Sequence, residues 1–378
     1  MQKQIATALE AAGGWLPFDA FMHLALYAPG LGYYAAGQQK LGLGPQDGSD
    51  FVTAPELSPF FGVTVARQVA EILQATQTDT VWEFGAGSGA LAAQVIPALQ
   101  AAGVALKQYY IVDVSANLRA RQQERLAEFA DLVQWVHALP EQMQGVILGN
   151  EVLDAMPVKL LARSSGVWHE RGVVVATNEE FEAKKAMKAV KPAWAASESI
   201  AFAYADKPTD LRPPLEPEGE HDYLTEVHPQ AEAFIATLAA RLQRGAMLFI
   251  DYGFGEQEYY HPQRSMGTVM CHQQHRADGD ALSDVGAKDI TAHINFTGIA
   301  LAAQNAGLEV LGYTSQGRFL LNCGLLTELE PASLPERSHA LKLVHEHEMG
   351  ELFKVIALGR DYDAELLGFQ SGDRTHTL

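Results

Sequence analysis

Apolar residues near the start of the chain recur at helical spacing. The repeat covers residues 6–9, 21–27 and 56–73, and a stretch rich in glycine and proline separates the last two segments over residues 29–55. Side chains three or four residues apart lie on one face of a helix, so this repeat is typical of amphipathic helices. It predicts an N-terminal helical cap.

From Thr80 the pattern changes to short apolar runs that alternate with helical segments. The runs cover residues 80–84, 109–113, 132–136 and 145–149, and helical spacing occupies residues 90–99 and 118–129. Alternating strands and helices form right-handed βαβ units around a parallel sheet. This part of the chain therefore predicts an α/β domain.

The α/β pattern is interrupted once and then resumes. Residues 158–175 indicate an antiparallel excursion with a Ser-Ser-Gly turn, and residues 179–220 have the composition of an irregular insertion. A helix is expected over residues 230–242, a strand over 247–250, a long loop up to Lys288, and a helix over 296–306. Strands over 308–313 and 352–358 flank a helical insertion.

These patterns divide the 378 residues into four parts. We expect a helical cap and cofactor lid over residues 1–75 and the first half of a Rossmann-like domain over 76–160. An inserted α+β subdomain follows over 161–228, and the second half of the domain, with its insertions, over 229–378.

Charge and cysteine content narrow the classes of partner. The chain has 46 acidic against 27 basic side chains, a formal charge of −19, which disfavours nucleic acid and favours a basic partner or simple solvation. Two cysteines, Cys271 and Cys323, do not make a disulfide framework, and no segment has the length of a membrane span. We expect a cytoplasmic protein that binds neither membrane nor nucleic acid; its oligomeric state stays open.

One short motif superficially suggests a metal site. Cys271 and His272 are followed by His275, but a convincing fourth ligand is lacking. We therefore predict no metal.

The first strand ends in a glycine-rich turn. Glu83 and Phe84 precede Gly85, Gly87 and Gly89, after which helical spacing begins. Glycines at alternate positions allow a backbone to pass close to a nucleotide-like ligand, although the same pattern also fits dinucleotide enzymes or a purely structural turn. The turn is the candidate cofactor loop.

Two carboxylates favour S-adenosylmethionine over a dinucleotide. Glu83, directly before the turn, suits the ammonium group of that cofactor and would repel a pyrophosphate. Asp113, at the end of the second strand, can accept hydrogen bonds from both ribose hydroxyls, a role shared with NAD enzymes. The sequence therefore predicts a methyltransferase, with a dehydrogenase as the weaker reading.

Motifs along most of the chain resemble those of the MidA-type family, which includes a mitochondrial complex I assembly factor that acts as a protein arginine methyltransferase. The motifs are Tyr27-x-Pro29-x-x-Gly32-Tyr33-Tyr34, Asp50-Phe51-x-Thr53-x-Pro55-Glu56-x-Ser58, Asn150-Glu151-x-x-Asp154-Ala155-x-Pro157-Val158, Ile250-Asp251-Tyr252-Gly253 and Asp289-Ile290-Thr291-x-His293. The chain departs from the family at Ser49, where glycine is usual, and at Asp113, where glutamate is common.

The resemblance implies a seven-stranded class I methyltransferase fold, S-adenosylmethionine as donor and a protein arginine as acceptor. It favours Glu56 and Ser58, with Asn150, as cofactor-binding residues, although capping of a helix explains the first two equally well.

The acceptor side of the site is predicted from residues after the fourth strand. Carboxylates can hold a guanidinium by forked hydrogen bonds, and Glu151 and Asp154 follow that strand at the sheet edge where ligands bind. An exposed Asp154 at a helix start is the alternative. His293 could orient the acceptor or relay its proton, or be a structural histidine.

Three functions remain open on the sequence alone. The first is methyl transfer to an arginine of a protein, the second is methyl transfer to a small molecule, and the third is an S-adenosylmethionine-binding assembly factor with little turnover.

Overall fold

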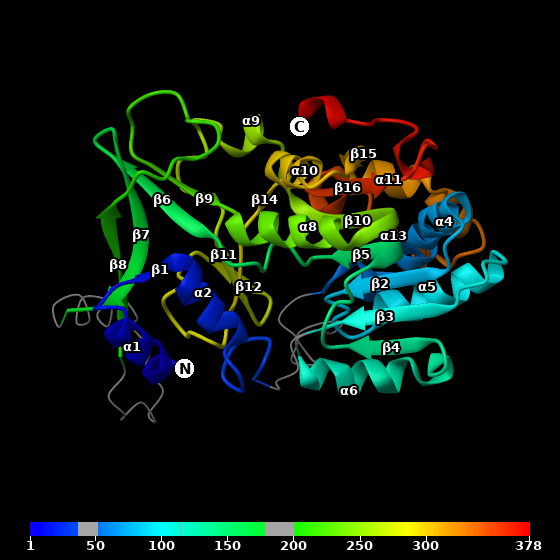
Figure 1. The fold of residues 1–378 in the computed structure, drawn as a ribbon, viewed down its shortest axis with the longest axis horizontal. Helices are drawn as coiled ribbons and strands as arrows, with labels where there is room; N and C mark the ends of the chain where they lie inside the picture. The colour runs from blue at the N-terminus through cyan, green and yellow to red at the C-terminus, as the bar shows by residue number, and fades with distance from the viewer. Residues whose placement is uncertain (37–51, 114, 178–199) are drawn as a thin grey trace. The chain divides into compact units, whose positions relative to one another are not determined.

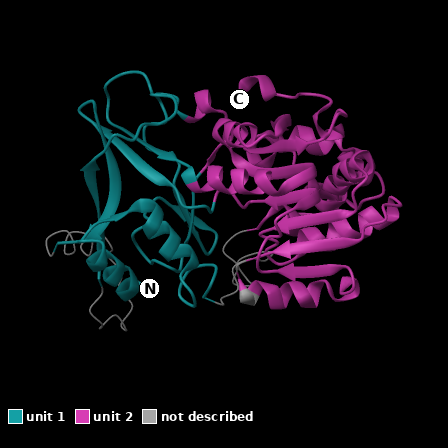
Figure 2. Ribbon diagram, viewed as in Figure 1, with its two compact units in different colours: residues 1–36, 155–229, 260–292 teal, residues 37–154, 230–259, 293–378 magenta. Residues whose placement is uncertain are grey.

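The computed structural model describes residues 1–36, 52–113, 115–177 and 200–378. These residues form two compact units (Figure 2), each built from three separate segments of the chain. Unit 1 comprises residues 1–36, 155–229 and 260–292, and unit 2 comprises 37–154, 230–259 and 293–378. Motif residues Ser49, Asp50 and Phe51 lie outside the described residues.

Unit 2 is an α/β structure around one mixed sheet (Figure 1). Its strands are β2 (Thr80–Phe84), β3 (Gln108–Val112), β4 (Val133–Val136), β5 (Met143–Asn150), β10 (Leu242–Phe254), β14 (Ile294–Asn295), β15 (Glu309–Ser315) and β16 (Phe353–Arg360). The order is β15-β16-β10-β5-β2-β3-β4, with β14 beside the end of β10. Strands β4, β3, β2, β5 and β10 are parallel, whereas β16 is antiparallel to both of its neighbours.

Helices cover both faces of this sheet, as a mainly parallel sheet requires. Helices α4 (Pro59–Thr76) and α5 (Ala90–Ala101) pack on the face that carries Val146, Leu148 and Leu248. On the other face, Phe234 of α8 (Pro229–Arg241) meets Phe84 and Phe249 edge to face.

The other helices of unit 2 among the described residues are α3 (Ala54–Leu57), α6 (Ala116–Arg125), α9 (Glu256–Tyr259), α10 (Phe296–Asn305), α11 (Gln316–Asn322), α12 (Leu325–Leu329) and α13 (Leu334–Lys342). Short helical turns lie at Ala127–Phe129, Glu346–Gly350, Leu367–Phe369 and Thr375–Thr377.

The described residues of unit 1 form two antiparallel sheets and two helices. Its helices are α1 (Gln2–Ala11) and α2 (Phe18–Tyr27); one sheet joins β1 (Leu16–Pro17), β7 (Val167–Val175), β6 (Lys159–Ser164) and β9 (Tyr223–Val227), with β8 (Phe202–Pro208) beside β7. The other has the order β12 (Arg276–Asp278), β11 (Met270–Gln273), β13 (Asp289–Thr291). The antiparallel excursion expected over 158–175 is confirmed by β6 and β7.

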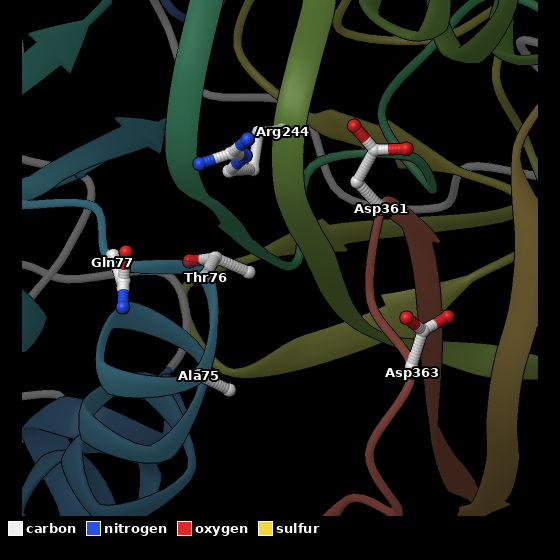
Figure 3. A pocket seen from close by; sticks show the side chains of 6 residues that line it. All are labelled: Ala75, Thr76, Gln77, Arg244, Asp361 and Asp363. Atoms are coloured by element: carbon white, nitrogen blue, oxygen red, sulfur yellow. The ribbon is translucent and has the colours of Figure 1, made fainter.

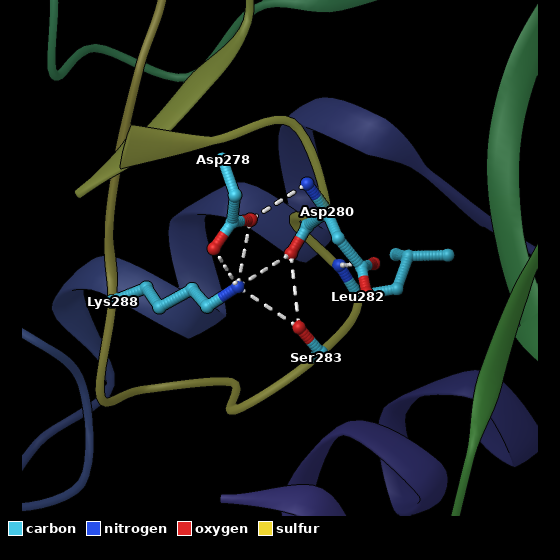
Figure 4. Close-up of polar contacts among 5 residues, drawn as sticks. All are labelled: Asp278, Asp280, Leu282, Ser283 and Lys288. Carbon is cyan, nitrogen blue, oxygen red and sulfur yellow. Dashed lines mark hydrogen bonds and ion pairs between the residues drawn. The ribbon is translucent and has the colours of Figure 1, made fainter. Parts of the chain in front are cut away.

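Lys288 closes the loop between β12 and β13 from inside unit 1 (Figure 4). Its side chain is almost fully buried, and Nζ donates to Asp278 Oδ1 at 2.8 Å and Oδ2 at 2.7 Å, to Ser283 Oγ at 2.9 Å and to the Asp280 carbonyl at 3.2 Å. A buried ammonium is tolerated only with partners of this kind. We assign Lys288 a structural role.

Two segments differ from the sequence-based expectation. The expected loop before Lys288 contains helix α9 and the hairpin β11–β12, whose two-residue turn places Gln274 and His275 at φ of 50° and 58°. Such turns normally carry glycine or asparagine, and this one has neither, so the sequence does not predict the hairpin. The expected irregular insertion contains strand β8, which pairs with β7 along its whole length.

Grouping residues 1–75 as one cap also differs from the way the described residues pack. Residues 1–36 belong to unit 1, whereas α4 lies in the core of unit 2 beside α5, β5 and β10. The reason is its apolar face, on which Phe61, Val65, Val69 and Leu73 are all buried.

Gly145 allows β5 to approach β2 closely. Its φ is +95°, and a Cβ placed there would lie 2.0 Å from the Thr80 carbonyl oxygen. We expect Gly145→Ala to lower the free energy of unfolding by about 3 kcal/mol, from backbone strain together with a contact that the sheet has no room to relieve. Urea unfolding measures this loss.

Gly103→Ala is the matched control for this substitution. Gly103 also has a left-handed φ, +74°, but nothing lies within 4 Å of a Cβ placed there. We expect it to cost only about 1 kcal/mol, the strain term alone. Equal losses in the two variants would contradict the close approach of β5 to β2.

Candidate cofactor and acceptor site

The glycine turn joins β2 to α5 at the carboxyl edge of the parallel strands. Gly85, Gly87 and Gly89 have φ of 60°, 54° and 82°, and Gly89 directly precedes α5. Residues other than glycine adopt this left-handed region only at a cost, so the backbone of the turn favours glycine at each of these positions. At Gly85 a Cβ would also come within 2.9 Å of Val152, from the loop after β5.

Glu83 is the last buried carboxylate before this turn. Its side chain is 2% exposed, and Tyr109 Oη donates to its Oε2 at 2.7 Å. Burial raises the pKa of Glu83 to about 7; the Tyr109 hydrogen bond acts in the opposite direction, and the charge of Asp113 adds to the rise. Among the described residues no cation acts on Glu83, so the site suits a ligand ammonium.

Asp113 is held by two hydrogen bonds after the end of β3. Oδ1 accepts the Ser115 amide at 2.9 Å, and Oδ2 accepts Gln122 Nε2 at 2.8 Å. Gln122 is fully buried and also donates to the Gly87 carbonyl at 2.9 Å, while its own oxygen accepts Trp135 Nε1 at 2.8 Å. Gln122 thus ties the glycine turn to Asp113, a role that no motif in the sequence signals.

Glu56 and Ser58 lie beside the same turn in different environments. Ser58 caps α4, since its Oγ accepts the Phe60 amide at 3.4 Å. Glu56 accepts Arg125 Nη1 on Oε1 at 2.6 Å and Nη2 on Oε2 at 3.1 Å, and Ser88 Oγ on Oε1. Although burial alone would raise it, the hydrogen bonds from Arg125 and Ser88 hold the pKa of Glu56 below its usual value.

The loop after β5 carries Asn150, Glu151 and Asp154. Glu151 has a left-handed φ of 54°, and its amide donates to the Ile250 carbonyl at 2.9 Å. Asn150 Nδ2 donates to Glu151 Oε1 at 3.0 Å, whereas Asn150 Oδ1 is buried and has no hydrogen-bond partner among the described residues. A buried acceptor of this kind fits a cofactor hydroxyl or amine.

The alternative of an exposed helix cap at Asp154 is wrong. Residues 151–158 form turns that lead into β6, with no helix, and the Asp154 side chain is only 5% exposed. The structural reason is Asp251, whose Oδ2 accepts the amides of Val152, Leu153 and Asp154 at 3.1, 2.8 and 3.3 Å. Asp251 was part of a sequence motif, but its partners lie about a hundred residues earlier.

His293 lies against the end of β10. Its ring is 5.1 Å from that of Tyr252 and 5.2 Å from that of Phe254, centroid to centroid. Tyr252 follows Asp251 directly, so His293 packs on the strand end that holds the Glu151 loop. The Cys271–His272–His275 motif lies instead on the β11–β12 hairpin, and among the described residues no cluster of ligands suited to a metal occurs.

A cavity of about 290 Å³ at the other edge of the sheet contains none of the candidate residues (Figure 3). It is lined by Ala75, Thr76, Gln77, Arg244, Asp361 and Asp363. These residues lie at the end of α4, the beginning of β10 and just beyond β16, which is the amino edge of the parallel strands. Ligands of open α/β sheets bind at the carboxyl edge.

Comparison with known proteins identifies the family. The family model described as "Putative S-adenosyl-L-methionine-dependent methyltransferase" matches residues 64–314. The chain belongs to this family. A likely methyl transferase from Burkholderia thailandensis, whose crystal structure holds S-adenosyl-homocysteine, is 47% identical in sequence to this chain. The two structures align with a TM-score of 0.91 over 100% of this chain and 96% of that one.

Curated relatives confirm the resemblance to the MidA-type family. The mitochondrial protein arginine methyltransferase NDUFAF7 of Danio rerio is 26% identical over 94% of this chain and 86% of its own length. Its Drosophila melanogaster homologue is 27% identical over 95% of this chain and 84% of its own length. S-adenosylmethionine is the cofactor of the family to which the chain belongs, and the carboxylates and glycines of unit 2 fit it.

Asp113 provides a direct test of the cofactor end of the site. We expect Asp113→Ala to weaken binding of S-adenosyl-homocysteine by about 1–3 kcal/mol, because a charged acceptor for the ribose hydroxyls is lost. Calorimetric titration measures the change. Asp131→Ala, an exposed carboxylate before β4, is the control, and an unchanged affinity of Asp113→Ala would remove Asp113 from the site.

Proposed function

We propose that the chain transfers a methyl group from S-adenosylmethionine to an arginine side chain of a protein. The observation that carries the proposal is the pair Glu151 and Asp154, presented at the carboxyl end of β5 by the Asp251 hydrogen bonds. The printed names of the curated relatives support the same acceptor. The net charge of −19 favours a basic protein segment and disfavours nucleic acid.

The strand order of unit 2 supports a Rossmann-like class I methyltransferase core. Consecutive parallel strands run outward from β2 in both directions, so the connections on either side of β2 leave a crevice at their carboxyl ends. The glycine turn, Asp113 and the Glu151 loop all lie at these ends. Donor and acceptor groups would therefore meet within unit 2.

In this reaction the protein mainly aligns the acceptor nitrogen with the methyl carbon of the donor. Bound S-adenosylmethionine supplies a methyl carbon on a positively charged sulfur. Glu151 and Asp154 would hold the guanidinium by forked hydrogen bonds and turn one nitrogen lone pair toward that carbon. As the new N–C bond forms, the S–C bond breaks and its electron pair stays on sulfur. Glu151 or His293 would accept the proton that the methylated nitrogen releases.

Two other functions share the cofactor half of the site. A small-molecule methyltransferase would place the label from S-adenosyl[methyl-³H]methionine in the low-molecular-weight fraction of a lysate. An assembly factor with little turnover would bind the cofactor and label nothing. The proposal expects label in protein, and amino-acid hydrolysis should recover it in methylarginine; label in methyllysine would overturn the arginine assignment, because an ammonium cannot reproduce the planar fork.

Glu151→Gln tests the acceptor role of the loop. The change is nearly isosteric and removes the charge that would orient the guanidinium. We expect kcat/KM for the labelled protein acceptor to fall by an amount that corresponds to about 2–4 kcal/mol of lost transition-state stabilisation. The affinity for S-adenosyl-homocysteine should be unchanged.

The control is Glu141→Gln, which removes an equal charge from an exposed position before β5. It should transfer methyl groups like the parent protein. Full activity of Glu151→Gln would exclude the guanidinium clamp.

A further inference from the structure

The hydrogen bond between Tyr109 and Glu83 joins two side chains that are otherwise sealed from water. Tyr109 is fully buried, Glu83 is 2% exposed, and the oxygen atoms are 2.7 Å apart. Burying a carboxyl group and a hydroxyl costs desolvation free energy even when they hydrogen-bond to each other. Two apolar side chains at these positions would pack without that cost. The presence of the polar pair beside the glycine turn calls for a functional reason.

The sheet fixes the tyrosine in place. In the β2–β3 register Tyr109 lies opposite Val81, two residues before Glu83, and Glu83 lies opposite Ile111. Residues two apart in a strand share a face, so the ring of Tyr109 extends along the sheet toward Glu83. Its ring belongs to the same buried core as Val133, its partner on β4, and Leu126.

Tyr109 can act only as a donor here. Burial, followed by the charge and the hydrogen bond of Glu83, raises the pKa of its hydroxyl well above the ordinary value, so it stays protonated. It occupies Glu83 Oε2, and among the described residues no hydrogen bond reaches the other carboxylate oxygen, Oε1, which stays available to a ligand.

We propose that Tyr109 is a positioning residue for the cofactor: its hydroxyl orients the Glu83 carboxylate toward the cofactor ammonium, and cofactor binding expels the proton that Glu83 carries in the free protein. The inference extends the assignment of Glu83 to the ammonium and does not depend on the identity of the methyl acceptor.

The sign of the proton linkage follows from the groups around Glu83. Burial raises its pKa to about 7, Tyr109 opposes the rise, and Asp113, the other titratable group that acts on it among the described residues, adds to it. Near pH 7 Glu83 is therefore partly protonated in the free protein, and an ammonium at Oε1 favours the charged form. Affinity should fall as the pH drops below 7.

Calorimetry in two buffers of different ionisation enthalpy measures this proton directly. At pH 7, binding of S-adenosyl-homocysteine should release a fraction of a proton, and the release should shrink as the pH rises above 7 and free Glu83 becomes charged. The probe 5′-methylthioadenosine has the adenosine and the sulfur but no ammonium, so it should bind without release. A buffer-independent heat for S-adenosyl-homocysteine at pH 7 would overturn the proposal.

Tyr109→Phe separates positioning from packing. The ring stays and only the hydroxyl is lost, so the pKa of Glu83 should rise further and the release at pH 7 should approach one proton. Affinity for S-adenosyl-homocysteine should fall roughly tenfold or more, while that for 5′-methylthioadenosine should be unchanged. Equal weakening of both ligands would mean a merely structural tyrosine and refute the proposal.

Two further variants complete the test. Tyr110→Phe removes a hydroxyl from the next residue, which faces the other side of the sheet and stacks on Trp82 at 3.9 Å between centroids, so both ligands should bind as in the parent protein. Glu83→Gln should abolish proton release and weaken only S-adenosyl-homocysteine; retained release would assign the proton elsewhere. Should Tyr109→Phe not fold, the two-ligand experiment on the parent protein decides alone.

Discussion

One carboxylate oxygen determines the course of the loop after β5 in unit 2. Asp251 Oδ2 collects the amides of Val152, Leu153 and Asp154, and so ties the loop after β5 to the end of β10. Burial and the charges of Asp154 and Glu151 raise the pKa of Asp251 well above its ordinary value, although the amides of Leu153 and Asp154 oppose this rise. Repulsion from these two carboxyl groups opposes the ionisation of Asp251. Under the proposed function, this loop would receive the positively charged acceptor.

The backbone at Glu151 adds a second cost to the same loop. Glu151 is held at φ of 54° by the hydrogen bond that its amide donates to the Ile250 carbonyl and by the Asp251 hydrogen bonds to the next three amides. Local strain of this kind persists only where surrounding hydrogen bonds impose it, and it is concentrated at functional sites. Strain and charge repulsion therefore point to the same few residues, those of the loop after β5.

Sequence reasoning could place the candidate residues at the ends of strands but not the hydrogen bonds among them. Strand β2 was predicted residue for residue and β3 to within one residue, because buried parallel strands read as short apolar runs. Glu83, Asp113 and Glu151 follow from their positions at strand ends. Gln122, Arg125 and Tyr109 could not be found this way, because their partners lie on other elements. Strand β8 was missed for a related reason: its pairing with β7, rather than its own composition, makes it a strand.

The two glutamates beside the glycine turn show how burial and pairing divide their roles. Arg125 neutralises Glu56 and holds its pKa low, so this carboxylate is charged at all physiological pH and already has its cation. Glu83 has a hydroxyl donor but, among the described residues, no cation, and its pKa is about 7. Carboxyl groups whose environments separate their pKa values take different tasks. Glu56 thus fastens α3 and α6 over the turn. Glu83 has no such cation among the described residues, and this difference supports the proposal that the ammonium end of the cofactor pairs with Glu83 rather than with Glu56.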